Sequence, residues 1–162
     1  MGARGPDEAT PDTTAPGRRV ALIAAPQRQL PFPARPSQLF GPSEFFTLAI
    51  TLAGRTADRI YILSPRYGLL VPDGPVIAPY RIDPPDLWPP ARRRAWAEGI
   101  LAALLRHLRP DDICVFYAGR AYRETVQYRL TQLGYRCEIP LQGLTPDSQI
   151  EHLRAAVAAT EQ

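Results

Sequence analysis

The chain has 162 residues, of which 45% are hydrophobic and 22% are charged, and this composition is typical of one globular domain. All 19 basic residues are arginine, which excludes a Schiff-base lysine and a phosphate loop of the Walker type. Two cysteines and two histidines exclude a conventional zinc site, and no apolar run is long enough to cross a bilayer, so we predict no metal and no membrane partner.

The charge is unevenly distributed along the chain, whose formal net charge is +3. Residues 1–17 hold one arginine and three acidic residues, which leaves 18 arginines against 13 acidic residues, or a net charge of about +5, in the rest. A basic domain favours an anionic partner. The alternative is that the arginines reflect a biased composition and only form a solvated surface, without binding a partner.

The first segment, residues 1–17, consists mainly of Gly, Ala, Pro, Thr and acidic residues without an apolar period, which predicts a disordered tail. It lacks the apolar core of a signal peptide, and two cysteines do not indicate a disulfide framework, so we predict a cytoplasmic protein. Residues 18–162 are predicted to form a single domain.

The first half of this domain is predicted to contain two strands with a helix between them. The apolar run 20–24 predicts a strand, and a Pro-rich loop follows over 27–42. Apolar side chains recur at helical spacing over 43–54 and predict a helix, and a second strand is predicted over 59–63. The long, Pro-dense segment 64–88 leaves little room for regular structure.

The second half continues the alternation. It is predicted to hold a long helix over 89–109, a strand over 112–117 and a helix over 120–133. A further strand over 135–139 and a last helix from the N-cap Thr145 onward follow. Alternating strands and helices predict an α/β fold, a three-layer domain with a mostly parallel central sheet of about four or five strands and helices on both faces.

The ligand side of such a sheet is set by its topology, because ligands bind beyond the carboxyl ends of parallel strands. This rule selects four segments, which are 25–28, 64–68, 118–123 and 140–143. Three of the four carry arginine, so we predict that arginines line the ligand side.

Arg120 and Arg123 fall in the first turn of their predicted helix, where cations oppose the helix dipole. A bound anion would remove this penalty, and Gly119 leaves the backbone open to a ligand. The alternative is local pairing, in which Glu124 reaches Arg120 across one helical turn.

The long loop after the second strand is predicted to be ordered, because it contains apolar and aromatic residues and several stiffening prolines. We expect it to fold over the strand ends and to present Arg66, Tyr67, Asp73, Tyr80 and Arg81. The alternative is that both tyrosines only pack and tie the loop to the body of the domain.

Asp73 is the carboxylate predicted to be best placed for acid–base chemistry, since it lies in this loop among arginines and tyrosines. A neighbouring arginine would keep it ionised, which suits a nucleophile or an electrostatic stabiliser. The alternative is a turn residue, because Pro72-Asp73-Gly74 is a strong turn signal.

Histidine and cysteine catalysis is not predicted. His107 and His152 lie away from the strand ends and are expected at the surface. Cys114 and Cys137 fall inside predicted strands, where cysteine is an ordinary small core residue, and a disulfide would require that these strands be adjacent.

A likeness to a known family begins with Ile62-Leu-Ser-Pro-Arg-Tyr-Gly-Leu-Leu70 and continues with Pro72-Asp73 and Ile77-Ala-Pro-Tyr80. These residues resemble the signature of the YaaA peroxide-stress proteins and of the small bacterial relatives called domain-of-unknown-function family 6884. The likeness covers about residues 20–153. It implies an α/β domain, and YaaA-type proteins are associated with DNA binding and oxidative stress.

Three positions depart from the patterns of the families that the chain resembles. Ala25 stands in place of a serine or a glycine, Arg28 stands where the YaaA group carries a lysine, and Arg81 stands where the smaller family usually has an aspartate. The resemblance therefore implies a fold and a pocket, and it names no reaction.

The functional hypothesis is a pocket at the strand ends that binds a nucleotide or a nucleic-acid phosphate without a cofactor, with action on an N-glycosidic bond as its enzymatic version. The alternatives are a non-catalytic DNA-binding stress-response protein and a binder of small anionic metabolites. We expect the candidate residues to converge on one cavity, with Asp73 as the catalytic carboxylate. The candidate binding residues are Arg28, Ser64, Arg66, Tyr67, Gly68, Tyr80, Arg81, Gly119, Arg120, Tyr122 and Arg123.

Overall fold

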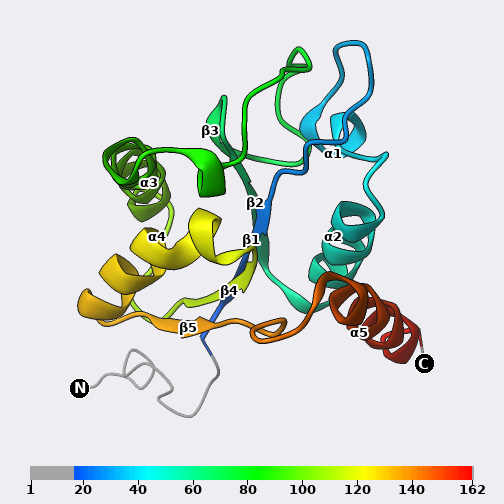
Figure 1. The fold of residues 1–162 in the computed structure, drawn as a ribbon. Coiled ribbons are helices and arrows are strands. Elements are labelled where there is room, and N and C mark those ends of the chain that lie inside the picture. The colour runs from blue at the N-terminus through cyan, green and yellow to red at the C-terminus, as the bar shows by residue number, and fades with distance from the viewer. Residues whose placement is uncertain (1–16, 162) are drawn as a thin grey trace.

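The computed structural model describes residues 17–161, so residues 1–16 of the predicted tail lie outside the described residues. A central five-stranded sheet has the order β3-β2-β1-β4-β5 (Figure 1). Its strands are β1 (Arg19–Ala24), β2 (Arg59–Ser64), β3 (Gly68–Leu70), β4 (Ile113–Tyr117) and β5 (Arg136–Glu138). β1 pairs in parallel with β2 and with β4, β4 pairs in parallel with β5, and only the edge strand β3 runs antiparallel to its neighbour.

Helices cover both faces of this sheet. They are α1 (Pro36–Leu39), α2 (Glu44–Thr56), α3 (Pro90–Leu105), α4 (Arg120–Gln132) and α5 (Pro146–Ala159), with a short 3₁₀ helix, η1, at Pro85–Leu87. α2 and α5 pack side by side on one face, and α3 and α4 pack on the other (Figure 1). The predicted three-layer α/β domain with a mostly parallel sheet is confirmed.

The strands are almost wholly apolar because each face meets its own layer of helices. On β1, Ala21 and Ile23 belong to the core beneath α2 and α5, whereas Val20 and Leu22 belong to the core beneath α3 and α4. Alternating side chains of one strand therefore contribute to two separate cores.

Two elements differ from the sequence-based prediction. The segment 64–88 contains the strand β3, because Gly68 takes a φ of 74° and turns the chain back so that Leu70 pairs with Ile62 of β2. The Pro-rich loop 27–42 contains the short helix α1, which has a proline in its first turn. This loop is also fastened to the later one, since Ala34 and Ile77 exchange two backbone hydrogen bonds of 3.1 and 3.0 Å.

Candidate functional site

The chain reverses its winding direction at the centre of the sheet. β1 leads into α2 on one face, whereas the neighbouring strand β4 leads into α4 on the opposite face. The loops that leave these two strands therefore diverge, and they leave a crevice at the carboxyl ends. In doubly wound sheets such a crevice is the usual ligand site.

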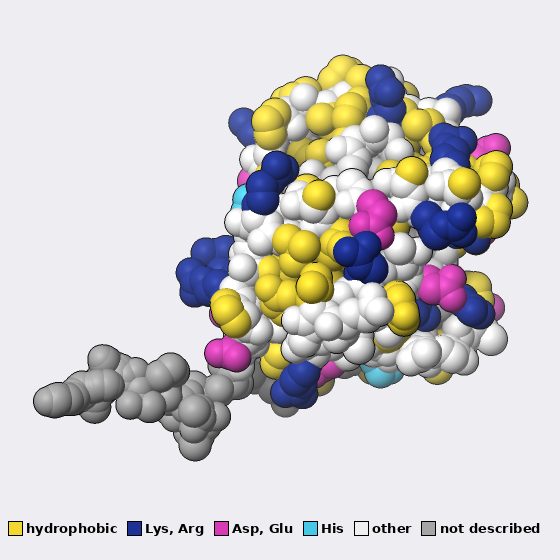
Figure 2. Space-filling model, turned by 90° about the vertical axis from the view of Figure 1, so that its left-hand side faces the viewer, with side chains coloured by type: hydrophobic (Ala, Val, Ile, Leu, Met, Phe, Trp, Pro, Cys, Tyr) yellow, Lys and Arg dark blue, Asp and Glu magenta, His cyan; other side chains and the backbone are white. Residues whose placement is uncertain are grey.

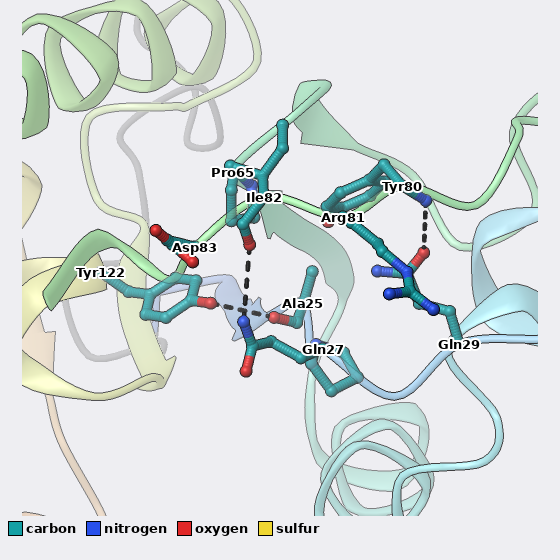
Figure 3. A pocket seen from close by; sticks show the side chains of 10 residues that line it. Ala25, Gln27, Gln29, Pro65, Tyr80, Arg81, Ile82, Asp83 and Tyr122 are labelled. Carbon is teal, nitrogen blue, oxygen red and sulfur yellow. Dashed lines mark hydrogen bonds between the residues drawn. The ribbon is translucent and has the colours of Figure 1, made fainter. Parts of the chain in front are cut away.

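A cavity of about 280 Å³ lies at this position, and we call it the switch-point pocket. Its walls come from the ends of β1 and β2, from the loop that precedes η1, and from the first turn of α4 (Figure 3). It is lined by Ala25, Pro26, Gln27, Gln29, Pro65, Tyr80, Arg81, Ile82, Asp83 and Tyr122.

Tyr80 is held from behind by the turn that ends β2. Its hydroxyl lies 3.0 Å from Oγ of Ser64, a residue with no exposed surface. The same Oγ accepts hydrogen bonds from the backbone N–H groups of Tyr67 at 3.0 Å and of Arg66 at 3.3 Å. On its other side, the backbone N–H of Tyr80 donates to Oε1 of Gln29 at 2.9 Å (Figure 3). Two segments far apart in the sequence therefore fix this tyrosine.

Tyr122 enters the pocket from α4. Its hydroxyl donates to the backbone carbonyl of Ala25 at 3.2 Å, which ties α4 to the end of β1 (Figure 3). The Tyr122 ring also meets the Trp96 ring edge to face, with centroids 5.9 Å apart. The indole N–H of Trp96 donates to the carbonyl of Ser64 at 2.9 Å. The floor of the pocket is thus a connected network rather than a set of independent side chains.

Arg81 and Asp83 supply the charge of the pocket, and both side chains are exposed. Within residues 17–161, neither of them forms an ion pair. One guanidinium group and one carboxylate are therefore open to a ligand from solvent.

The pocket tyrosines predict a loss of stability at alkaline pH. Burial raises the pKa of Tyr80 to about 12, and burial likewise raises the pKa of Tyr122 above its ordinary value of 10.0. The unfolded chain releases these protons near pH 10, so above this pH the unfolded state binds fewer protons and is favoured as the pH rises. We expect each of the two tyrosines to add a slope of about −1.4 kcal/mol per pH unit to the free energy of unfolding.

Urea unfolding at a series of pH values tests this expectation. Tyr122→Phe should flatten the alkaline slope, whereas Tyr128→Phe, at a position whose side chain is 63% exposed, should leave it unchanged. Equal slopes in the wild type and in Tyr122→Phe would show that the Tyr122 phenol ionises as easily in the folded state as in the unfolded chain.

Of the residues predicted from the sequence, Tyr80, Arg81 and Tyr122 line the switch-point pocket. Ser64 does not line it but positions Tyr80. Tyr67 stands behind Tyr80, with ring centroids 5.6 Å apart, and its hydroxyl donates to the carbonyl of Ala78 at 2.9 Å.

Gly119, Arg120 and Arg123 line a second, smaller hollow of about 100 Å³ near the ends of β4 and β5. Arg120 pairs with Glu124 at 2.9 Å, which confirms the local pairing that the sequence offered as an alternative. Arg123 donates to the carbonyl of Ala118 at 3.2 Å and to Oε1 of Gln127 at 2.8 Å. Both guanidinium groups thus already have partners within the chain.

Arg28, Arg66 and Asp73 are exposed and line neither of these two hollows. The Arg66 guanidinium lies over the ring of Tyr67, 5.6 Å from its centroid. The carbonyl of Asp73 accepts a hydrogen bond from Arg35 at 3.2 Å, within the braced pair of loops. The candidate residues therefore do not converge on one cavity, contrary to the expectation, and a catalytic role for Asp73 stays a prediction.

The candidate set predicted from the sequence lacks three polar residues of the pocket. Gln27 and Gln29 lie just beyond β1. Gln27 lies within the segment 25–28 that the strand-end rule selects, and Gln29 follows it directly. The charged residue Arg28 was chosen from this segment instead. Asp83 lies ten positions beyond Asp73 and outside the turn motif. The available signals were the position of Gln27 at a strand end and the position of Asp83 as one of few carboxylates near the strand ends, where Asp73 was preferred because it lies among arginines and tyrosines.

The cysteines and histidines lie apart from the pocket. Cys114 and Cys137 are register partners on β4 and β5, both are free thiols, and burial raises the pKa of Cys114 to about 12. His107 stacks on Tyr61 with ring centroids 5.6 Å apart, and His152 is exposed. In the part of the chain that the structure describes, no three His, Cys, Asp or Glu side chains gather as a metal site, and no helix there has the length and apolarity of a membrane span.

The chain belongs to a family of unknown function, DUF6884, whose model matches residues 20–155. This match confirms the resemblance to the smaller of the two families, while the likeness to the YaaA group stays a prediction. No curated protein and no solved structure matches the chain.

Proposed function

We propose that the switch-point pocket binds a nucleotide, with the base inside and the phosphate directed toward Arg81. The observation that carries this proposal is the placement of Arg81, Asp83 and two tyrosines around one cavity at the carboxyl ends of β1, β2 and β4. Open α/β sheets bind ligands at this position.

The size and polarity of the pocket support a base or nucleoside as the enclosed part. Its volume of about 280 Å³ is close to the lower end, roughly 300 Å³, of small-molecule sites. Gln27, Tyr80 and Tyr122 offer hydrogen bonds to a heterocycle, and Asp83 offers two acceptor oxygens to N–H groups or to a ribose diol. A phosphate fits the exposed guanidinium of Arg81, which presents a planar fork of donors.

The enzymatic version of this proposal places Asp83, rather than Asp73, beside the reacting carbon, because Asp83 is the pocket carboxylate. In hydrolysis of an N-glycosidic bond, the bond between the sugar and the base breaks and a water oxygen bonds to the anomeric carbon. A proton of that water passes to the Asp83 carboxylate, and the base leaves with a proton from solvent.

We expect Arg81→Gln to weaken binding of a mononucleotide at least about tenfold, because a charge-assisted hydrogen bond to phosphate is lost. Calorimetric titration with AMP, GMP, CMP and UMP measures this effect, and inorganic phosphate shows how much of it comes from the anion alone. Arg28→Gln is the matched control, because Arg28 is exposed nearby but does not line the pocket. It should bind within about twofold of the wild type.

Absence of binding by all four nucleotides, or equal losses in Arg81→Gln and Arg28→Gln, would contradict the proposal. The rival is a DNA-binding surface, for which affinity would fall steeply with salt and would not depend on Arg81. Figure 2 shows that, on the face that carries α3 and α4, the arginines are scattered among hydrophobic and acidic side chains, so this face presents no continuous basic surface.

A further inference from the structure

The hydroxyl of Ser64 has all its hydrogen-bonding capacity assigned. A serine hydroxyl carries one proton and two lone pairs. Both lone pairs face backbone donors, the N–H groups of Arg66 and Tyr67, at 3.3 and 3.0 Å. Among residues 17–161, the only remaining partner is the Tyr80 hydroxyl at 3.0 Å, so Ser64 donates its proton to Tyr80.

The proton of Tyr80 is consequently available to a ligand. Its oxygen accepts from Ser64, and among residues 17–161 the Tyr80 hydroxyl has no second hydrogen-bond partner. The reverse arrangement, with Tyr80 donating to Ser64, would leave the proton of a fully buried serine without an acceptor. Because Tyr80 lines the pocket, this proton is available to a ligand bound there.

Tyr122 has the opposite character. Its partner is the backbone carbonyl of Ala25, which has no proton to give, so Tyr122 must be the donor in that bond. Only the lone pairs of the Tyr122 oxygen remain for a ligand. The two rings enter the pocket from different sides (Figure 3), and the site therefore offers one hydroxyl donor and one hydroxyl acceptor.

We propose that the switch-point pocket recognises the edge of a heterocycle that carries one hydrogen-bond acceptor and one donor. Tyr80 donates to the acceptor of this edge, and Tyr122 accepts from its donor. Ser64 sets the direction of the Tyr80 hydroxyl. The lactam edge of a base, a carbonyl next to a ring N–H, is such an edge. The identification of the ligand as a nucleobase rests on the proposed function, whereas the direction of the hydroxyl groups does not.

The ionisation of Tyr80 depends on the same surroundings. Burial raises the pKa of Tyr80, and the hydrogen bond with Ser64 lowers it by a smaller amount. The ionisable side chain packed against Tyr80 from its own loop is Tyr67, and Tyr122 faces it from α4.

The ability of Ser64 to donate to the Tyr80 oxygen is testable without a nucleotide. The full chain is labelled with fluorotyrosine, whose phenol ionises at lower pH than that of tyrosine, and the Tyr80 signal is assigned by its disappearance in Tyr80→Phe. Fluorine NMR then follows its titration. Ser64→Ala should raise the pKa of the phenol at position 80, because the phenolate loses a donor. An unchanged or lowered pKa would overturn the assignment of Ser64 as donor.

Recognition of the edge is tested with two ligands that differ only there, inosine monophosphate and purine riboside monophosphate, which lacks the lactam. We expect the wild type to bind the inosine compound about tenfold more tightly and Tyr80→Phe to lose most of this preference. Tyr67→Phe is the control, since the Tyr67 ring meets that of Tyr80 edge to face but does not line the pocket, and it should keep the preference.

The outcomes separate the two proposals. Equal binding of both compounds by the wild type overturns edge recognition and leaves the proposed function standing. A preference that survives in Tyr80→Phe overturns the role of Tyr80. Binding of neither compound contradicts the proposed function and edge recognition together, and the fluorotyrosine titration then tests separately whether Ser64 donates to the Tyr80 oxygen.

Discussion

Asp112→Ala is expected to lower the free energy of unfolding by about 3–5 kcal/mol, the range found when one partner of a buried ion pair is removed. The Asp112 side chain is 1% exposed and that of its partner Arg18 is 14% exposed. Oδ2 accepts from Nη2 of Arg18 at 2.8 Å and Oδ1 accepts from Nε at 3.1 Å, so the pair is bidentate. Oδ2 also accepts the backbone N–H of Arg109 at 2.8 Å. The substitution therefore removes the anionic partner of the guanidinium, which keeps only the carbonyl of His107 at 3.0 Å, and leaves the backbone N–H of Arg109 without its acceptor.

The position of this pair explains why its loss should affect the whole fold. Arg18 directly precedes β1 and Asp112 directly precedes β4, and these strands are neighbours in the sheet. The pair thus ties the amino end of β1, whose carboxyl end bounds the switch-point pocket, to that of β4, which leads into α4 and Tyr122. Removing it weakens the register on which the pocket depends.

Chemical denaturation of the wild type and its variants measures the effect. Asp111→Ala is the matched control, because the adjacent carboxylate is exposed and its loss should change the free energy of unfolding by less than about 0.5 kcal/mol. Arg18→Ala combined with Asp112→Ala should cost less than the sum of the two single losses, since each single variant leaves a charge unpaired. A loss below about 1 kcal/mol in Asp112→Ala would mean that the pair contributes no more than a surface ion pair does.

The sheet and its helices were predictable from the sequence because each element has a local pattern. The apolar run after residue 58 predicts β2, and the structure extends that strand by one residue, to Ser64. The Ser43 side chain caps α2 by accepting the N–H of Phe46 at 3.1 Å, a contact between residues three apart. Such signals need no knowledge of distant segments.

Strand β3 was not predictable in the same way. It has only three residues, Gly68–Leu70, and it is a strand because Leu70 pairs with Ile62. No period can be seen over so short a stretch. The pairing arises from a turn with positive φ at Gly68, and a sequence shows only that a glycine permits it.

The candidate site was partly predictable for a related reason. Topology selected the strand ends and so found Tyr122, while Tyr80 and Arg81 were found because the long loop after β2 was expected to fold over those ends. It did not show where a long side chain bends, and Arg123 turns back to the carbonyl of Ala118 and to Gln127 instead of facing the pocket. Side-chain direction at a helix start depends on neighbouring partners, which the position of the residue in the chain does not reveal.

Trp88→Ala is expected to lower the free energy of unfolding by about 3–5 kcal/mol, the usual cost of removing a buried aromatic side chain. Trp88 is 5% exposed and closes η1. Its ring meets that of Trp96 edge to face at 5.7 Å, and the Arg92 guanidinium lies 4.1 Å from its centroid on the outside. The indole N–H donates to the carbonyl of Asp83 at 2.8 Å. The substitution therefore removes core packing and also frees a residue of the switch-point pocket.

Two further variants separate these contributions. Trp88→Phe keeps most of the ring packing but loses the donor to the carbonyl of Asp83. The lost hydrogen bond should lower the free energy of unfolding by about 1 kcal/mol. The free energy of mononucleotide binding should weaken by more than this amount. Arg92→Gln removes only the outer cation, which is worth about 0.5–1 kcal/mol at an exposed site, and should leave binding unchanged. Thermal unfolding and calorimetric titration of the three variants provide both measurements. If Trp88→Phe and Arg92→Gln bound nucleotides with equal affinity, the indole hydrogen bond would not position Asp83. The shape of the pocket would then depend on Trp96 and Tyr122 rather than on Trp88.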